Sequence, residues 1–265
     1  FGAALAERAQ GEVLRCSVRA ETDAPLRVLA WSMTRAGLRA TLRTPDGEHT
    51  LVSPKVGAHN LENLLVALGC AAALGVSYVN AIAACSTLVG APGRLERVPC
   101  EEDVAVFVDY AHTPDALERT VQALRVLSPA RLITVFGCGG DRDRGKRPLM
   151  AQAASRASDL VVLTSDNPRT EEAERILDDV EGGFAHASLT RVVADELLSA
   201  TRAYTRVVDR RDAIALAIRS ARPGDTVLIA GKGHEDYQIF GTTKVPFDDR
   251  VEAAAALAAR TRRDA

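Results

Sequence analysis

Five short, largely apolar segments in the second part of the chain most restrict its fold. Stretches of helical character separate these segments, which are 104–109 (VAVFVD), 132–136 (LITVF), 160–163 (LVVL), 205–208 (TRVV) and 226–230 (TVLIA). Continuous apolar runs without polar alternation predict strands that are covered on both faces. Strands that alternate with helices predict an α/β fold, here a doubly wound and mostly parallel Rossmann-like sheet with right-handed crossovers.

The region before these strands has a different pattern. Three β-rich runs predict an antiparallel meander, with the turn sequence TPDGE between the last two; the runs are 26–33, 38–43 and 49–53. Two Ala- and Leu-rich stretches, 60–75 and 78–88, predict a pair of packed helices. The change of pattern predicts two domains, with residues 1–92 in the first and 93–265 in the second.

Two stretches of the second region have weaker patterns. Residues 181–204 lack clear periodicity, and we expect a helix with a variable loop there. The sequence VEAAAALAAR, which follows FDDR, predicts a final helix with Asp248 or Asp249 as its cap.

Composition and charge exclude several classes of partner. A formal net charge of -2 gives no reason to expect binding to nucleic acid or to a membrane surface. No apolar run reaches the roughly 20 residues that span a bilayer. The five cysteines contain no CxxC pair, which favours a reducing cytoplasm over a zinc site or a disulfide framework. We expect a monomer, and the start at Phe1 without a leader pattern suggests a piece of a longer chain.

Polar and unusual residues follow four of the five predicted strands. In an open parallel sheet, ligands bind beyond the carboxyl ends of the strands, so these segments are expected to surround one crevice. The segments are DYAHTPD (109–115), GCGGDRDRGKRP (137–148), TSDNPR (164–169) and GKGHEDYQ (231–238).

The glycine-rich segment 137–148 combines close backbone approach with four cations. Such a loop is suited to an anionic ligand, although it can also be a solvated basic loop; the cations are Arg142, Arg144, Lys146 and Arg147. Cys138 lacks an evident helix N-terminus or base beside it, so we interpret it as a small packed residue.

The other segments each leave two interpretations open. Asp109 could accept hydrogen bonds from a ribose and His112 could contact a phosphate, or both could be capping or loop residues. Glu235, in its glycine-flanked segment, could bind an ammonium group or could lie in an ordinary surface turn. Asn60 and Asn63 are three residues apart and share a helical face, so they could bind a ligand, or be a cap and a buried residue.

The segment TSDNPRTEE (164–172) contains a misfit. Asn167 as cap and Pro168 at the first helical position predict a helix start, which the following two glutamates favour. Arg169 would then lie in the first turn, where the helix dipole disfavours a cation. We therefore expect Arg169 to hold a ligand.

Taken together and in order, six segments resemble the Mur ligase family. They are GAHNLENLLVA, GAPGRLE, VDYAHTPDAL, FGCGGDRDRGKRPLM, DNPRTEE and AGKGHEDYQ, and the likeness extends from about residue 26 to 262. The resemblance implies an ATP-dependent ligase that forms an amide bond through an acyl phosphate, with Mg²⁺ as a further cofactor. Its implied substrates are the UDP-N-acetylmuramoyl dipeptide and meso-diaminopimelate, in peptidoglycan precursor synthesis. Residues 1–92 would end the central ATPase domain and 93–265 would form the C-terminal domain.

The resemblance also implies roles for individual residues. Those expected at ATP are Asn60, Asn63, Arg94, Asp109 and His112. Those expected at diaminopimelate are Arg142, Asp166, Asn167, Pro168, Arg169, Gly231 and Glu235. The distal end of this diamino acid carries a carboxylate and an ammonium. Arg142 and Arg169 as a pair suit the carboxylate. The ammonium is suited by Asp166, Asn167 and Glu235.

One expected motif of the family is missing. The sequence GxxxxGK[ST], which forms a phosphate-binding loop, does not occur in these 265 residues, and we place no catalytic residue or metal ligand in them. We therefore expect no ATP turnover by this chain alone. The alternatives are a lysine-adding Mur ligase, a relative of folylpolyglutamate synthetase, and a non-catalytic module that binds an amino acid.

Overall fold

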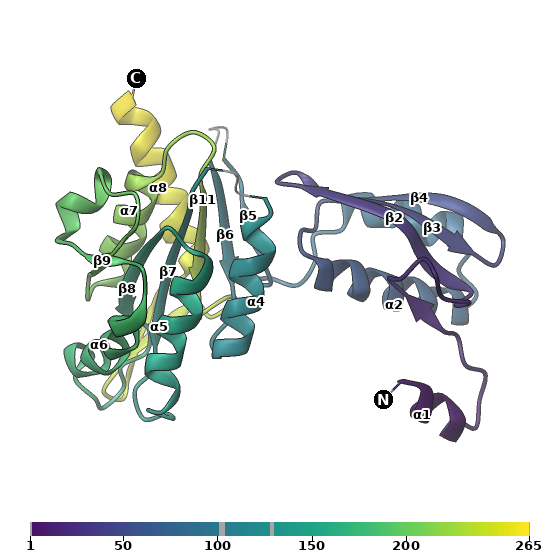
Figure 1. Cartoon of the computed structure of the whole chain (residues 1–265), viewed down its shortest axis with the longest axis horizontal. Coiled ribbons are helices and arrows are strands. Elements are labelled where there is room, and N and C mark those ends of the chain that lie inside the picture. Colours follow the sequence, from purple (N-terminus) through teal and green to yellow (C-terminus); the bar gives the residue numbers. More distant parts are fainter. Residues whose placement is uncertain (1, 101–103, 128–129, 265) are drawn as a thin grey trace. The chain divides into compact units, whose positions relative to one another are not determined.

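The chain folds into two compact units, Phe1–Val89 and Gly90–Ala265. The computed structural model describes residues 2–100, 104–127 and 130–264. Figure 1 shows a small sheet with helices in the first unit and a larger layered fold in the second.

The first unit is a four-stranded sheet with two of its helices packed against it. Its elements are α1 (Gly2–Arg8), β1 (Cys16–Ser17), β2 (Leu26–Thr34), β3 (Gly37–Thr44), β4 (Gly47–Ser53), α2 (Ala58–Ala73), α3 (Tyr78–Ala84) and η1 (Cys85–Thr87). Strands β2, β3 and β4 are antiparallel neighbours, so the predicted meander is confirmed. Leu61, Leu64, Leu65 and Leu68 recur at helical spacing on α2 and are buried in the core with the strand side chains.

The second unit is built on a seven-stranded sheet. Its elements are β5 (Glu96–Val98), β6 (Ala105–Asp109), α4 (Pro114–Arg125), β7 (Leu132–Cys138), α5 (Lys146–Ala157), β8 (Leu160–Ser165), α6 (Ala173–Glu181), η2 (Gly182–His186), β9 (Thr190–Arg191), η3 (Ala194–Leu198), β10 (Ala203–Arg206), α7 (Arg210–Ser220), β11 (Thr226–Ala230), β12 (Tyr237–Phe240), β13 (Thr243–Pro246) and α8 (Asp249–Asp264). The strand order is β5-β6-β11-β7-β8-β10-β9, and β12 and β13 form a separate hairpin. All neighbours in the large sheet are parallel except β5 and β6, so the predicted α/β fold is confirmed.

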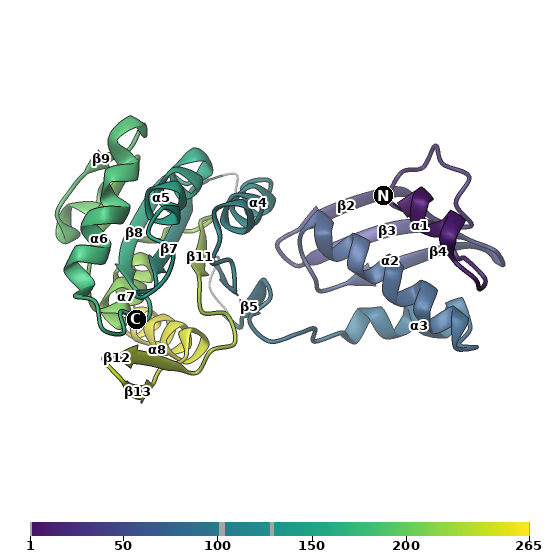
Figure 2. The same ribbon diagram turned by 90° about the horizontal axis from the view of Figure 1, so that it is seen from below.

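Helices cover both faces of this sheet. Helices α4, α5 and α6 lie on one face, and α7 and α8 lie on the other (Figure 2). Every residue of β6, β7, β8 and β11 is buried. Burial on both faces is the physical reason that these strands form continuous apolar runs in the sequence.

Two predicted element boundaries differ from the structure. Strand β10 spans Ala203–Arg206 rather than 205–208, although the Val207 N–H still bonds to the Leu163 oxygen at 2.9 Å. In place of a helix over 181–204, the chain has two 3₁₀ turns and the short strand β9, because this segment packs along the sheet edge beside β10.

The start of the final helix agrees with one of the two predicted caps. Helix α8 begins at Asp249, and the Asp248 carboxylate accepts a hydrogen bond from the Arg250 N–H at 2.9 Å. Asp249 is instead buried against Arg210.

Candidate functional site

Four loops converge at the carboxyl edge of the large sheet. Strands β6, β11, β7 and β8 are consecutive neighbours, so the segments that follow them meet, as the sequence predicts. Hydrogen bonds join these loops directly: Lys146 Nζ donates to the His112 oxygen at 2.9 Å, and Lys232 Nζ donates to Asp166 Oδ1 at 3.3 Å.

The predicted helix start at Asn167 is wrong, because the segment after β8 is a loop there. Helix α6 begins at Ala173 with Glu172 as its N-cap, so Arg169 is in no helical turn. Its backbone has a φ of 52°, and its N–H and oxygen bond to Ile239 and Gly241 of the β12–β13 hairpin at 3.0 and 2.7 Å. The helix dipole therefore does not explain Arg169, whereas a left-handed backbone held by two hydrogen bonds marks a constrained position.

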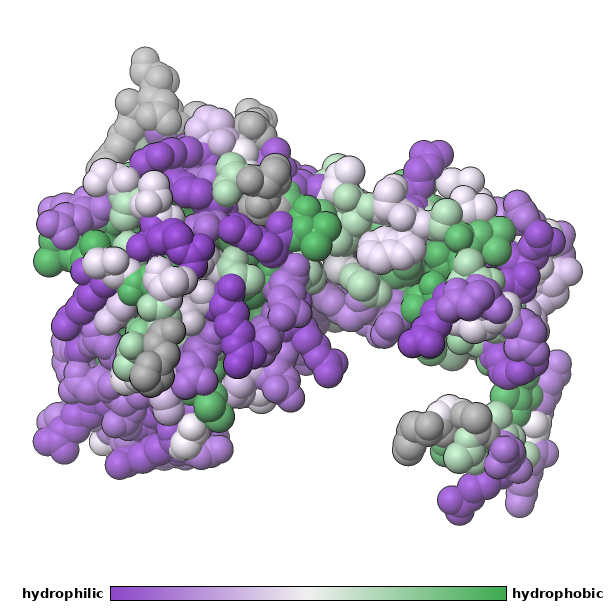
Figure 3. Space-filling view, viewed as in Figure 1, coloured by the Kyte–Doolittle hydropathy of each residue, from purple (hydrophilic) through white to green (hydrophobic). Residues whose placement is uncertain are grey.

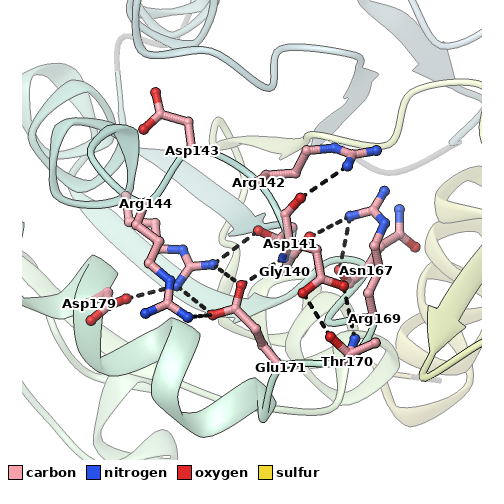
Figure 4. Close-up of polar contacts among 12 residues, drawn as sticks. Gly140, Asp141, Arg142, Asp143, Arg144, Asn167, Arg169, Thr170, Glu171 and Asp179 are labelled. Atoms are coloured by element: carbon pink, nitrogen blue, oxygen red, sulfur yellow. Dashed lines mark hydrogen bonds and ion pairs between the residues drawn. The ribbon is translucent and has the colours of Figure 1, made fainter.

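Side-chain atoms of Arg142 and Arg169 both lie close to Gly139. A Cβ added at that glycine would be 2.9 Å from Arg169 Nη1 and 3.7 Å from Arg142 Cγ. Arg169 Nη1 donates to the Gly140 oxygen at 2.9 Å, and Arg142 Nη1 donates to the Asp141 oxygen at 3.0 Å. Figure 4 shows both guanidinium groups on the same side of the loop. Two neighbouring guanidinium forks can bind a carboxylate through paired hydrogen bonds.

The remaining arginines of the basic segment are paired with Glu171, and Figure 4 labels this glutamate and Arg144. Arg147 donates to both oxygens of this carboxylate, at 2.8 and 3.1 Å, and Arg144 Nη2 donates to one of them at 2.9 Å. Hydrogen bonds from Arg147, followed by the Asp141 N–H, hold the pKa of Glu171 at about 2. Arg144 and Arg147 therefore join the two segments through Glu171.

A second group of charges lies at the ends of β8 and β11. Lys232 is fully buried, and its ammonium donates to Asp166 Oδ1, Asn167 Oδ1 and Glu235 Oε2 at 3.3, 3.2 and 3.1 Å. Asn167 Nδ2 also donates to Glu235 Oε2, at 3.0 Å. The sequence interpretation gave Lys232 no role, and a charged residue between two glycines at a strand end was the only signal for it.

Gly231 and Pro168 are shaped by close backbone contacts. Gly231 has a φ of 118°, which disfavours any other residue, and its N–H donates to the Asp109 oxygen at 3.0 Å. Pro168 is buried, and a Cβ at Gly140 would be 1.9 Å from its oxygen. Both residues therefore fix the backbone of the loops that carry the charged groups.

Arg94 and His112 both contact Tyr110. The Arg94 guanidinium lies 4.8 Å from the centre of the Tyr110 ring, and the His112 ring meets it edge-on at 4.7 Å. Both residues are exposed, so their cationic or hydrogen-bonding groups are accessible to an anion.

Asp109 has an internal role. Its carboxylate accepts hydrogen bonds from Leu95 N, Ala111 N and Thr120 Oγ1, at 2.7, 2.9 and 3.3 Å. The residue is 9% exposed, and these contacts agree with the alternative of a loop residue that the sequence left open. Asp109 fixes the segment that carries Arg94.

The two asparagines belong to the first unit. Asn60 is the third residue of α2, where the N-cap is Gly57, and its Nδ2 donates to the Val56 oxygen at 2.7 Å. Asn60 is therefore not the capping residue itself, and Asn63 is exposed rather than buried.

The described residues provide no obvious metal centre. Within 2–100, 104–127 and 130–264, no three His, Cys, Asp or Glu side chains are grouped so that they could hold an ion. Cys138 is 3% exposed, and burial raises the pKa of its thiol to about 12, consistent with a packed residue. No described helix is both long and apolar enough to cross a membrane, and the face of the second unit seen in Figure 3 is mostly hydrophilic.

Comparison with known proteins gives a consistent match. The profile of the Mur ligase glutamate ligase domain matches residues 93–233. UDP-N-acetylmuramoyl-L-alanyl-D-glutamate--2,6-diaminopimelate ligase of Gloeobacter violaceus is 51% identical over 231 residues, which are 87% of this chain and 44% of that protein. The ligase of the same name from Geobacter metallireducens is 45% identical, over 97% of this chain and 50% of its own length. The chain thus spans about half the length of the curated relatives it matches.

Solved structures agree with these relatives. A structure of UDP-N-acetylmuramoyl-L-alanyl-D-glutamate--2,6-diaminopimelate ligase superposes with a TM-score of 0.69 at 37% identity, covering 98% of this chain and 50% of that one. Folylpolyglutamate synthase of Mycobacterium tuberculosis, at 24% identity and a TM-score of 0.61, shares the fold over 98% of this chain and 51% of its own. With a family profile over more than half of its residues, this chain belongs to the Mur ligase family.

Proposed function

We propose that this chain is part of a ligase that adds meso-diaminopimelate to UDP-N-acetylmuramoyl-L-alanyl-D-glutamate. Relatives of 45 to 51% identity carry that name, and they support the assignment over the lysine-adding and folylpolyglutamate alternatives. The proposal places residues 1–92 at the end of the central ATPase domain and 93–265 in the C-terminal domain. It also includes a monomeric, cytoplasmic enzyme of peptidoglycan precursor synthesis.

The observation that carries this proposal is the separation of charges at the sheet edge. Arg142 and Arg169 both lie close to Gly139, whereas Asp166 and Glu235 lie around the ends of β8 and β11. The distal end of meso-diaminopimelate carries a carboxylate and an ammonium on one carbon. In the proposed complex, the arginines bind that carboxylate and the two acidic side chains bind that ammonium.

Binding in this way leaves the other amino group of the diamino acid free to react. In the proposed reaction, ATP supplies the phosphoryl group that converts the D-glutamate carboxylate into an acyl phosphate. The free amine attacks the acyl carbon, an amide bond forms, and phosphate leaves. The residues of this chain contribute by orienting the amine, because a correctly placed nucleophile lowers the entropic cost of the reaction.

The proposed contacts to ATP are assigned residue by residue. Arg94 and His112 are exposed cationic or hydrogen-bonding groups that suit a nucleotide phosphate or ribose, and Asn60 and Asn63 are proposed on the adenine side. Asp109 supports Arg94 from behind through the Leu95 N–H. Among the described residues, no group of three or more His, Cys, Asp or Glu side chains could hold Mg²⁺ by itself.

An amino-acid panel tests the proposed function. A ligation assay with the complete ligase that contains this chain would compare meso-diaminopimelate, L-lysine and L-glutamate as acceptors. Because buried polar groups are left unpaired when a ligand lacks the matching group, kcat/KM for meso-diaminopimelate is expected to exceed that for L-lysine by up to about 10⁴-fold. Equal use of L-lysine, or preferred use of L-glutamate, would contradict the proposal.

A further inference from the structure

The ammonium of Lys232 is fully used by protein acceptors. A lysine ammonium has three N–H donors, and three oxygens lie within hydrogen-bond distance, one each from Asp166, Asn167 and Glu235. The Lys232 side chain is 0% exposed, whereas those of Asp166 and Glu235 are 12% and 20% exposed. Lys232 therefore lies beneath the two carboxylates and has no donor left for a ligand carboxylate.

Lys232 also determines which way the Asn167 amide faces. Asn167 Oδ1 accepts from Lys232 Nζ at 3.2 Å and from the Ile239 N–H at 3.1 Å. A flipped amide would place its NH₂ group against these two donors, so only the observed orientation is satisfied. In that orientation Nδ2 must donate toward Glu235 Oε2, which fixes the glutamate in turn.

The cluster formed by Lys232, Asp166 and Glu235 has a net charge of -1. Asp166 and Glu235 carry two negative charges, and the single positive charge of Lys232 offsets one of them. The adjoining ion pair between Arg210 and Asp249 is neutral as a unit and is completely buried. The cluster thus matches the charge of one ligand ammonium.

Asp166 and Glu235 each have one carboxylate oxygen that suits such a ligand. Among the residues that the structure describes, Lys232 and Asn167 use Glu235 Oε2, and Lys232 uses Asp166 Oδ1. In the same set, no hydrogen bond is made to Glu235 Oε1 or Asp166 Oδ2. One oxygen of each carboxylate is therefore left to accept from an ammonium.

We propose that Lys232 is a positioning residue for the amino-acid substrate, which turns one oxygen of Asp166 and of Glu235 inward and leaves the other for the ligand ammonium. This inference rests on the proposed function and adds Lys232 to the residues that determine which amino acid the ligase selects. It predicts that the loss of Lys232 weakens binding of the diamino acid and leaves binding of the nucleotide unchanged.

The main test uses Lys232→Met in the complete ligase and in this chain. The variant keeps an unbranched chain of similar length but lacks the ammonium, so Asn167 and Glu235 lose their common partner. Because a hydrogen bond to a charged group is worth about a factor of ten or more, we expect KM for meso-diaminopimelate to rise at least about tenfold. The KM for ATP is expected to stay within about twofold of wild type.

Asp225→Asn is the matched control. Asp225 forms a buried ion pair with Arg131 at the opposite edge of the sheet, where its carboxylate is 1% exposed. This substitution removes a buried charge of similar burial, so it should lower stability while leaving the KM for meso-diaminopimelate within about twofold of wild type. A purely structural role of Lys232 would make the two variants behave alike.

Hydrogen exchange of the Ile239 amide tests the role of Lys232 without any ligand, and therefore independently of the proposed ligase function. The Ile239 amide bonds to Asn167 Oδ1, so its hydrogen exchange in the isolated chain should be faster in Lys232→Met than in Asp225→Asn. If Lys232→Met does not fold, Lys232→Gln, which keeps two N–H donors but no charge, should show the same selective rise in KM. Unchanged KM for meso-diaminopimelate in a folded Lys232 variant would overturn the role of Lys232 alone. Failure of the wild-type ligase to use meso-diaminopimelate would overturn the proposed function and the role of Lys232 together.

Discussion

Glu171 accepts hydrogen bonds from both terminal nitrogens of Arg147, at 2.8 and 3.1 Å. Arg147 lies in the first turn of α5, directly after the loop that follows β7, and Glu171 lies in the loop after β8. This ion pair therefore joins the two segments that carry Arg142 and Arg169. The Asp141 N–H donates to the same carboxylate at 2.7 Å. One carboxylate therefore helps to set the separation of the two arginines that are proposed to bind the ligand.

The low pKa of Glu171 predicts a loss of stability in acid. Its pKa falls from 4.5 to about 2 on folding, so its contribution is complete above about pH 4.5 and is lost as the pH falls toward 2. Glu171→Gln should lower the urea midpoint at pH 7 and should flatten its decline between pH 5 and 2. Urea titrations of both proteins at several pH values check this. Parallel curves over that range would contradict it.

A methyl group at Gly140 should displace the loop after β8. The added Cβ would lie 1.9 Å from the Pro168 oxygen, a backbone atom that cannot move independently of the loop. We expect Gly140→Ala to lower the free energy of unfolding by about 1–3 kcal/mol. Gly182→Ala, where no atom lies within 4 Å of the added Cβ, is the control and should change it by less than about 0.5 kcal/mol. Equal effects in denaturant titrations would contradict the steric argument.

The framework of the second unit could be predicted from the sequence because burial on both faces leaves a local pattern. Strands β6, β7, β8 and β11 are completely buried. The start of α6 could not be predicted in this way. The sequence Asn167-Pro168 suits a helix start as well as a loop, and the loop is selected by backbone bonds from Arg169 to residues 239 and 241, about seventy positions away.

Charge pairing was the part of the site that the sequence could not determine. Arg144 and Arg147 have the same local signature as Arg142, but only the folded chain brings Glu171 to them. Lys232 likewise acquires two of its three partners, Asp166 and Asn167, from a different strand end. A pattern of residues can predict that charges gather at a sheet edge, whereas the partner of each charge depends on tertiary distances of a few ångströms.

The buried pair of Arg210 and Asp249 should be strongly coupled. Arg210 Nε and Nη2 donate to the two Asp249 oxygens at 2.8 and 2.7 Å, and both side chains are 0% exposed. Arg210→Met leaves a buried carboxylate unpaired, so we expect a loss of about 3–5 kcal/mol, and Asp249→Leu should cost a similar amount. The double variant should cost less than the two single variants together. Additive losses in a denaturant-based double-mutant cycle would rule out this coupling.

The isolated chain should not turn over ATP. No GxxxxGK[ST] sequence occurs in its 265 residues, so it lacks a loop of backbone N–H groups to hold the phosphates. A phosphate-release assay on the isolated chain, with the UDP-linked dipeptide and meso-diaminopimelate present, should give a background rate. Turnover equal to that of the complete ligase would show that these residues suffice.

Arg169→Lys should separate charge from geometry in the proposed carboxylate site. Lysine keeps the positive charge but loses the planar fork that pairs with a carboxylate and bonds to the Gly140 oxygen. We expect KM for meso-diaminopimelate in the complete ligase to rise by at least about tenfold, with the KM for ATP nearly unchanged. The discrimination against L-lysine should fall, because the arginine fork is the group that the distal carboxylate of meso-diaminopimelate uses. Arg175→Lys, in the exposed ion pair with Glu172 at 2.8 Å, serves as the control and should leave both constants unaltered. If Arg169→Lys retains the wild-type KM and preference, the distal carboxylate is held elsewhere.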